Sequence, residues 1–446
     1  MNKKRWLPVL GFLLIAGCRM AAAEMVARGD TAKGTVTPAA IDAHAAAVET
    51  GRDSVPRFGF TAYINPGMQI ATDRRIKKLL KETGTVGVGA ELSYMTLPSD
   101  SDNYASDFGF PTLSLGLRYT FNNSVRMHRD PDPIWGTAQE VDYDSRLGNT
   151  LSLYVSFRRP ILRIRHWEVD YTLGAGLAWS NRAYNPNDDI DNELIGSHIN
   201  CYFNAGAHIT YHFVPEWGIK MGVDFVHHSN GALDRPNKGS NAVGPTIGIT
   251  YTPYYEAVRT APRYAQRHVP FDQYLYLNFT VGAGMKALHE EYSWTQYKAD
   301  PTDADYRTEH FHHYAAYSVQ MDFMWRYARR WASGIGFDVF YGTYHQRLAE
   351  LDAYRGKERT HSPWSLGVAG KHTVFYGQWS LPMEVGWYCF RRMGYNAKIS
   401  DKPYYERIGL HYHFAALSNI SIGINVSAHA FKANFTEIAA SVPVRL

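Results

Sequence analysis

The sequence predicts an all-β protein, a transmembrane antiparallel β-barrel of about sixteen strands, on three observations. Aromatic residues make up 14% of the 446 residues, with 31 Tyr and 11 Trp. Mean hydropathy is −0.34, and beyond the first few dozen positions no stretch approaches the roughly 20 continuous apolar residues that a membrane-spanning helix needs. Apolar and polar residues alternate instead, which suits a wall with one face toward lipid and the other toward a lumen.

This alternation is clearest in the stretch Trp167–Trp179. One face carries Trp, Val, Tyr, Leu, Ala, Leu and Trp, and the other carries Glu, Asp, Thr, Gly, Gly and Ala. The same pattern recurs over 86–94 and 275–285. Gly87 and Gly89 therefore belong to a strand, and a phosphate-binding loop is disfavoured because no helix start follows them.

A faint internal repeat explains the length of the chain. Tyr211-His212-Phe213 and Tyr412-His413-Phe414 lie 201 positions apart, and about eight strands precede Tyr255. We therefore expect one barrel half over residues 58–255, a connector over 256–271 and a second half over 272–446. Alternation alone does not distinguish one wide barrel from two eight-stranded barrels, since both need the same pattern.

The N-terminus predicts export from the cytoplasm. Lys3–Arg5 form a basic segment and Leu7–Ile15 a short apolar one, so residues 1–23 are expected to be a signal peptide. Cleavage after Ala21–Ala23 is favoured over a lipobox that would acylate Cys18, because barrels are usually not lipoproteins. Residues 24–57 have no apolar period and are predicted to form a flexible periplasmic segment.

Charge and cysteine content narrow the class of function. The net charge is +4, from 46 basic and 42 acidic residues, without a long basic run, so no nucleic acid is expected as a partner. Cys201 and Cys389 stand alone, without the spacing of a zinc or redox site, and are predicted to be inert; nothing in the sequence argues for a disulfide between them.

The stretch Trp217–Ser229, the seventh predicted strand, carries the candidate chemistry. Steps of two along it place His227 and Ser229 on the same face as the apolar positions, whereas His228 points into the barrel with Lys220 and Asp224. Residues two apart on a strand are separated by roughly 6–7 Å, so an imidazole can reach a serine hydroxyl and activate it. With a periplasmic N-terminus this strand runs outward, and the pair faces lipid at the outer leaflet.

The residues around this pair resemble a known family. His227–Leu233 reads His-His-Ser-Asn-Gly-Ala-Leu and Pro236–Gly239 reads Pro-Asn-Lys-Gly. These runs resemble the His-x-Ser-Asn and Pro-Asn-x-Gly signature of outer-membrane lipid A 3-O-deacylases of the PagL type, chiefly over residues 58–255. The resemblance implies an outer-membrane barrel that hydrolyses the ester-linked acyl chain at position 3 of lipid A. Its partners would be lipopolysaccharide and membrane lipid, and no cofactor or metal would be needed.

The resemblance also implies roles for individual residues. Ser229 would be the nucleophile and His227 its base, while Asn237 and the backbone N–H of Ala232 would bind the oxyanion, with Asn230 in support. One residue departs from the pattern: Asn241 stands twelve positions after the nucleophile, where the family carries an acidic residue that orients the histidine. An amide oxygen can also accept an imidazole N–H, so activity is still expected.

The second half and two side-chain clusters carry competing interpretations. His429 lies near the position that matches the pair, but no His-x-Ser-Asn follows it, so the second half is predicted to be non-catalytic. A cluster of three histidines could ligate zinc or form a solvated rim: His310, His312 and His313. An acidic loop could bind a divalent cation or simply be hydrated: Asp188, Asp189, Asp191 and Glu193.

At the level of function, two alternatives remain open. One is a non-enzymatic porin or structural barrel, which a single sixteen-stranded closure would favour because it leaves a wide lumen. The other is a general surface esterase or phospholipase, which would share the His–Ser pair and differ in substrate. The apolar approach over Ile219–Phe225 favours a membrane-resident acyl ester over a soluble one.

Overall fold

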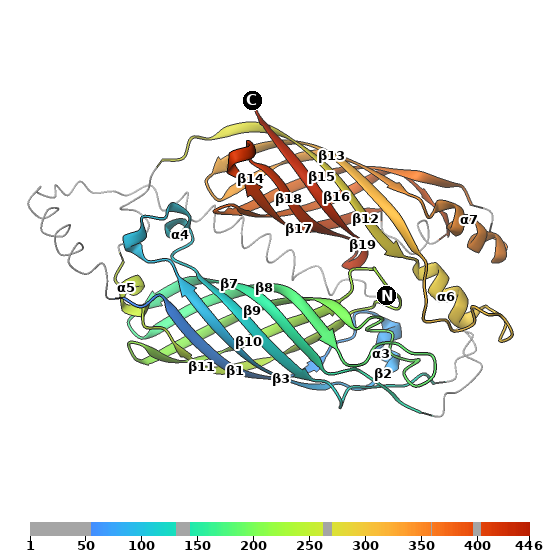
Figure 1. Cartoon of the computed structure of the whole chain (residues 1–446), viewed down its shortest axis with the longest axis horizontal. Coiled ribbons are helices and arrows are strands. Elements are labelled where there is room, and N and C mark those ends of the chain that lie inside the picture. Colours follow the sequence, from blue (N-terminus) through green and yellow to red (C-terminus); the bar gives the residue numbers. More distant parts are fainter. Residues whose placement is uncertain (1–54, 131–142, 262–269, 358, 396–402) are drawn as a thin grey trace, which may run out of the picture. The chain divides into compact units, whose positions relative to one another are not determined.

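The computed structural model describes residues 55–130, 143–261, 270–357, 359–395 and 403–446. The expected signal peptide, residues 24–54 of the expected periplasmic segment and residues 262–269 of the connector lie outside these ranges. Antiparallel strands dominate the described residues (Figure 1). None of the helices found there is long and apolar enough to cross a membrane.

The first barrel closes from eight antiparallel strands, in the order β1-β11-β10-β9-β8-β7-β4-β3. Its strands are β1 Phe58–Gln69, β3 Gly84–Met95, β4 Thr112–Phe121, β7 Thr150–Ile164, β8 Trp167–Ser180, β9 Ile199–Val214, β10 Trp217–Ser229 and β11 Ser240–Tyr251. Each strand pairs with its neighbour in sequence, and β1 closes the barrel against β11. The predicted seventh strand is thus β10, with the predicted bounds.

The second barrel repeats this up-and-down order from β12 to β19. Its strands are β12 Tyr274–Ala287, β13 His313–Ala328, β14 Trp331–Gly342, β15 His361–Tyr376, β16 Trp379–Met393, β17 Tyr404–Phe414, β18 Ile420–His429 and β19 Lys432–Arg445. Pairing of β12 with β19 closes it separately from the first barrel. The sixteen strands therefore form two narrow barrels, and the wide closure that would favour a porin is not formed.

Both walls follow the predicted alternation. Along β10 the side chains of Ile219, Met221 and Val223 are exposed, whereas those of Lys220 and Asp224 are buried in the lumen. Exposed apolar residues recur around both barrels, a surface that only a lipid bilayer would cover favourably over this extent.

Side chains fill both lumens, as expected for eight-stranded barrels. In the first, His208 lies between two carboxylates, with Nδ1 3.2 Å from Asp170 Oδ1 and Nε2 3.2 Å from Asp224 Oδ1. In the second, Lys371 Nζ lies 2.7 Å from carboxylate oxygens of Asp322 and Asp338. Each lumen is thus a polar core rather than an open channel.

Four connections of the first barrel, including the two longest (122–149 and 181–198), lie at one rim, called here the Ser229 rim because β10 ends there. They carry helix α3 (Arg74–Leu79) and a small sheet of β2 (Leu80–Glu82), β5 (Arg126–Met127) and β6 (Ser145–Arg146). The opposite rim carries short turns and the small helices η1 (Pro98–Asp100), α4 (Asn103–Asp107) and α5 (Tyr255–Arg259).

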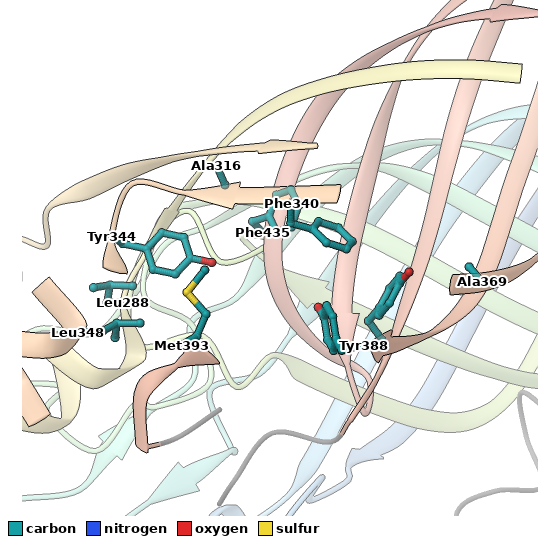
Figure 2. Packing of buried hydrophobic residues seen from close by; sticks show 10 residues of the cluster. Leu288, Ala316, Phe340, Tyr344, Leu348, Ala369, Tyr388, Met393 and Phe435 are labelled. Atoms are coloured by element: carbon teal, nitrogen blue, oxygen red, sulfur yellow. The ribbon is translucent and has the colours of Figure 1, made fainter. Parts of the chain in front are cut away.

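In the second barrel, α6 (His289–Tyr297) follows β12 and α7 (His345–Tyr354) follows β14, while the short η4 (Ala415–Leu417) joins β17 to β18. Leu288, Leu348, Tyr344 and Met393 pack together beside these two longer helices, as Figure 2 shows. The same buried cluster includes four aromatic side chains of the barrel strands, Phe340, Tyr388, Tyr405 and Phe435.

The acidic loop that carries Asp191 and Glu193 was predicted either to bind a divalent cation or to be hydrated, and the structure shows a different environment for these two residues. Asp191 and Glu193 are buried, and arginines neutralise them: Arg129 Nε lies 3.0 Å from Asp191 Oδ1, and Arg75 Nε donates to Glu193 at 2.9 Å. Because arginines occupy the carboxylates, the predictions of a hydrated loop and of a cation site are both wrong for these two residues. The loop instead packs the Ser229 rim.

Candidate active site

Strand β10 presents the candidate pair at its end. His227 pairs in register with Asn241 of β11 and with Phe203 of β9, and Ser229 pairs with Cys201. The intervening His228 points into the lumen, where its Nε2 lies 3.2 Å from Ser152 Oγ. His227 and Ser229 therefore share the outward face. They are more covered than open membrane-facing residues, since Ser229 is only 8% exposed.

A continuous hydrogen-bonded relay joins three side chains there. His227 Nε2 lies 3.0 Å from Ser229 Oγ, and His227 Nδ1 lies 2.8 Å from Asn241 Oδ1. Asn241 Nδ2 donates to the carbonyl of Gly239 at 3.0 Å, which only the amide nitrogen can do. The amide oxygen must therefore face the imidazole and accept Nδ1–H. This leaves Nε2 as the unprotonated nitrogen toward Ser229.

The residues predicted to bind the oxyanion lie in the loop Asn230–Gly239 between β10 and β11. Asn230 N donates to Asn237 Oδ1 at 3.2 Å, so the amide oxygen of Asn237 faces the loop backbone. The predicted donor Ala232 N instead donates to Asn230 Oδ1 at 3.1 Å. The structure thus brings all three residues together, but the Ala232 N–H is engaged within the loop.

The surroundings of Gly239 explain why the Pro-Asn-x-Gly run ends in glycine. Its φ is +78°, and a Cβ added there would lie 2.7 Å from His227 Cε1. A side chain would therefore displace the imidazole, and only glycine lets the backbone pass against the ring. Sequence reasoning named the motif but missed this contact, for which the glycine itself was the signal.

Two residues of the loop, Asn230 and Arg235, are held by side-chain interactions with its surroundings. Asn230 Nδ2 donates to Ser197 Oγ at 3.1 Å, so Ser197 supports the loop, whereas neighbouring His198 bonds the Ser180 carbonyl. Arg235, in the same loop, is buried, and burial lowers its pKa to about 10. At neutral pH the guanidinium therefore remains charged beside the candidate site.

The remaining predicted clusters do not form sites. Within the ranges that the structure describes, no group of three His, Cys, Asp or Glu side chains is placed to hold a metal ion, His310, His312 and His313 included. Cys201 and Cys389 are both free thiols. In the second barrel, the 201-residue offset pairs His429 with lumen-facing His228, and His429 Nε2 bonds Tyr388 Oη at 2.7 Å.

Comparison with known proteins identifies two matching families along the chain. Residues 113–250 match the family described as lipid A 3-O-deacylase (PagL). Residues 272–442 match the family described as acyloxyacyl hydrolase, C-terminal domain. No curated protein matches. Together the two families account for most of both barrels.

Solved structures with a similar fold include the outer membrane enzyme PagL, at 15% identity and a TM-score of 0.26, covering 44% of this chain and 99% of that one. Another is the N-terminal β-barrel domain of OprF from Pseudomonas aeruginosa, at 16% identity and a TM-score of 0.22, covering 44% of this chain and 96% of that one. At such scores these likenesses carry no argument about function. The two family matches instead identify a PagL-type lipid A 3-O-deacylase barrel over residues 113–250 and a second barrel of the acyloxyacyl hydrolase C-terminal family over residues 272–442.

Proposed function

We propose that the first barrel is a serine esterase that hydrolyses the ester-linked acyl chain at position 3 of lipid A. The observation that carries this proposal is the relay in which His227 lies 3.0 Å from Ser229 Oγ and 2.8 Å from Asn241 Oδ1. A serine hydroxyl is a weak nucleophile until an adjacent base takes its proton, and a neutral imidazole does so near neutral pH.

The chemistry follows the acyl-transfer pattern. Ser229 Oγ attacks the ester carbonyl while its proton passes to His227 Nε2, and the negative charge develops on the former carbonyl oxygen. His227 then returns the proton to the departing sugar oxygen, and the acyl chain remains on Ser229. A water molecule, deprotonated by His227, then attacks the acyl carbon. The bond from this carbon to Ser229 Oγ breaks, His227 returns the proton to Oγ, and the fatty acid is released.

Asn241 and Asn237 act differently in this scheme. Asn241 accepts Nδ1–H and so holds the imidazole in the tautomer that the first step requires. Asn237 has its amide oxygen toward Asn230, which turns its NH₂ group away from the loop backbone and makes it the oxyanion donor we favour. The Ala232 N–H joins it when Asn230 Oδ1 releases that contact.

The position of the pair supports a membrane-resident substrate. Below it on the same outward face of β10 stand Ile219, Met221 and Val223, all exposed. An acyl chain of a lipid lying in the bilayer would run along this apolar strip and bring its ester to the end of the strand. A soluble ester gains nothing from that strip.

Mass spectrometry of lipid A tests the proposal directly. Cells that produce the wild-type protein are expected to lose one ester-linked acyl chain from lipid A, and cells producing Ser229→Ala are expected to retain it. Heat-modifiable migration on gels establishes that both proteins are folded barrels. An identical acyl pattern in cells with wild-type protein, with Ser229→Ala and with no protein would refute the function.

A further inference from the structure

We infer that the second barrel is a positioning module for the catalytic loop Asn230–Gly239 of the first. This inference rests on the proposed function, since it assigns a purpose to contacts that surround the proposed nucleophile. Its core is a set of hydrogen bonds between that loop and the two strands that close the second barrel, β12 and β19.

Three hydrogen bonds join the segment directly after Ser229 to these strands. Ala287 N, at the end of β12, donates to the carbonyl of Ala232 at 2.9 Å. Arg235 Nε returns a bond to the carbonyl of Ala287 at 2.9 Å. Thr436 Oγ1, on β19, donates to the carbonyl of Gly231 at 2.8 Å. Two consecutive carbonyls of the loop are therefore held by the second barrel.

The held segment has a backbone that needs support. Gly231 has φ +64° and Ala232 has φ +72°, and a left-handed alanine is unfavourable because its Cβ crowds the neighbouring carbonyl. Such a conformation persists only where the surroundings over-determine it. Ala232 is fully buried, with its N–H bonded to Asn230 and its carbonyl bonded to Ala287. Without the second barrel, the hydrogen bond to the Ala232 carbonyl would be lost, and only the bond from the Ala232 N–H to Asn230 would remain.

The loop also lies close to β19 at Gly231. A Cβ added to Gly231 would meet Thr436 Oγ1, so a side chain there would displace the threonine hydroxyl from the Gly231 carbonyl. The glycine of the His-x-Ser-Asn-Gly run thus serves two requirements, the positive φ and the contact with the second barrel.

A second line of contacts reaches the imidazole from helix α6. Tyr297 Oη donates to Glu193 Oε1 at 2.8 Å. The backbone of Glu193 and Leu194 accepts from Lys238 N and Gly239 N, each at 3.0 Å. Gly239 in turn anchors the Asn241 amide that holds His227. The second barrel therefore supports both the segment after the nucleophile and the residue that orients the base.

Apolar packing accompanies this second line. Tyr184 and Ile190 of the first barrel's β8–β9 connection form one buried cluster with Ala287, Tyr292 and Phe311 of the second. Apolar packing fixes the distance between the two parts, and the hydrogen bonds fix the loop conformation. A second half that has no His–Ser pair of its own thus acts on the reaction of the first.

The decisive experiment compares two Thr→Val substitutions in the full-length protein, both within the second barrel. Thr436→Val removes the hydroxyl that binds the Gly231 carbonyl. Thr280→Val is the matched control, because Thr280 Oγ1 bonds Ser441 Oγ at 2.8 Å inside the lumen. Purified lipid A in detergent micelles is the substrate, and a fluorophosphonate probe reports the rate of Ser229 labelling.

We expect Thr436→Val to lower kcat about tenfold with KM little changed, because the oxyanion donors are displaced while the acyl-binding strip is intact. Labelling of Ser229 should slow by a similar factor, and Thr436→Ser, which restores the hydroxyl, should recover both rates. Thr280→Val should match wild type. Tyr297→Phe, which breaks the second line, should give a smaller decrease in kcat.

The possible results separate a failure of the positioning role from a failure of the proposed function. Equal kcat and labelling rates for Thr436→Val and Thr280→Val, in folded heat-modifiable protein, overturn the positioning role while Ser229-dependent activity stands. Equal losses of activity in both variants also overturn it, because the effect would then be general destabilisation. An active Ser229→Ala protein instead overturns the proposed function itself.

Discussion

The two barrels end their seventh strands in different ways. In the first, β10 leads into the ten-residue loop Asn230–Gly239 before β11 begins. In the second, β18 turns into β19 through two residues, Ala430 and Phe431, with φ of +51° and +65°. Two consecutive positive φ angles are typical of the tight hairpin turn whose twist matches the strands it joins.

The comparison shows that the connection, rather than the wall, determines where a site can form. The 201-residue offset places Ala428 and Ala430 at the positions of His227 and Ser229. It keeps the lumen-facing histidine, since His228 corresponds to His429, and both bond a hydroxyl inside their barrels. The repeat has thus kept a lumen residue and lacks both the catalytic pair and the loop that carries the oxyanion residues.

The largest effect on activity is expected when the histidines of the two barrels are substituted one at a time. His227→Ala should lower deacylation by at least about 10³-fold, because the base is lost while the substrate-binding surface remains. His228→Ala and His429→Ala should retain most of the activity, because both side chains face a lumen. Rates with purified lipid A check this. A His228→Ala loss as deep as that of His227→Ala would show that the two faces were assigned wrongly.

An intermediate effect is expected at Asn241. Asn241→Leu should cost about 10²-fold in kcat, less than the about 10⁴-fold that follows disturbance of a charged orienter in serine proteases. Asn241→Asp should keep or raise activity, because a carboxylate stabilises the imidazolium, although it forfeits the donor to the Gly239 carbonyl. Steady-state rates of both variants test this, and a sharp loss in Asn241→Asp would contradict the orienting role.

The smallest effect concerns the second barrel. Placing the pair there by Ala428→His with Ala430→Ser, in a Ser229→Ala background, should restore no deacylation, since the two-residue turn supplies no oxyanion donors and no orienting amide. The lipid A acyl pattern of producing cells is the measurement. Recovered deacylation would show that the pair alone suffices and that the long loop is dispensable.

Much of the fold was predictable because the alternation that indicates a strand involves residues close together in the sequence. Strand alternation reports which side chains meet lipid, and the stretch Trp217–Ser229 became β10 with the same bounds. The contact between His227 and Asn241 was also accessible, because a spacing of fourteen residues across one antiparallel connection sets them opposite each other. The acidic loop was misjudged, because its partners Arg129 and Arg75 come from distant segments.

By itself the sequence determined the strands, their outward faces and the residues of the proposed catalytic pair, since each depends on positions a few residues apart. Only the tertiary structure decided that β1 pairs with β11 and β12 with β19, giving two closed barrels instead of one. It alone decided that Thr436 and Ala287 hold the loop after Ser229. Strand closure and loop support join residues far apart in the chain, and no periodicity along the sequence records such pairings.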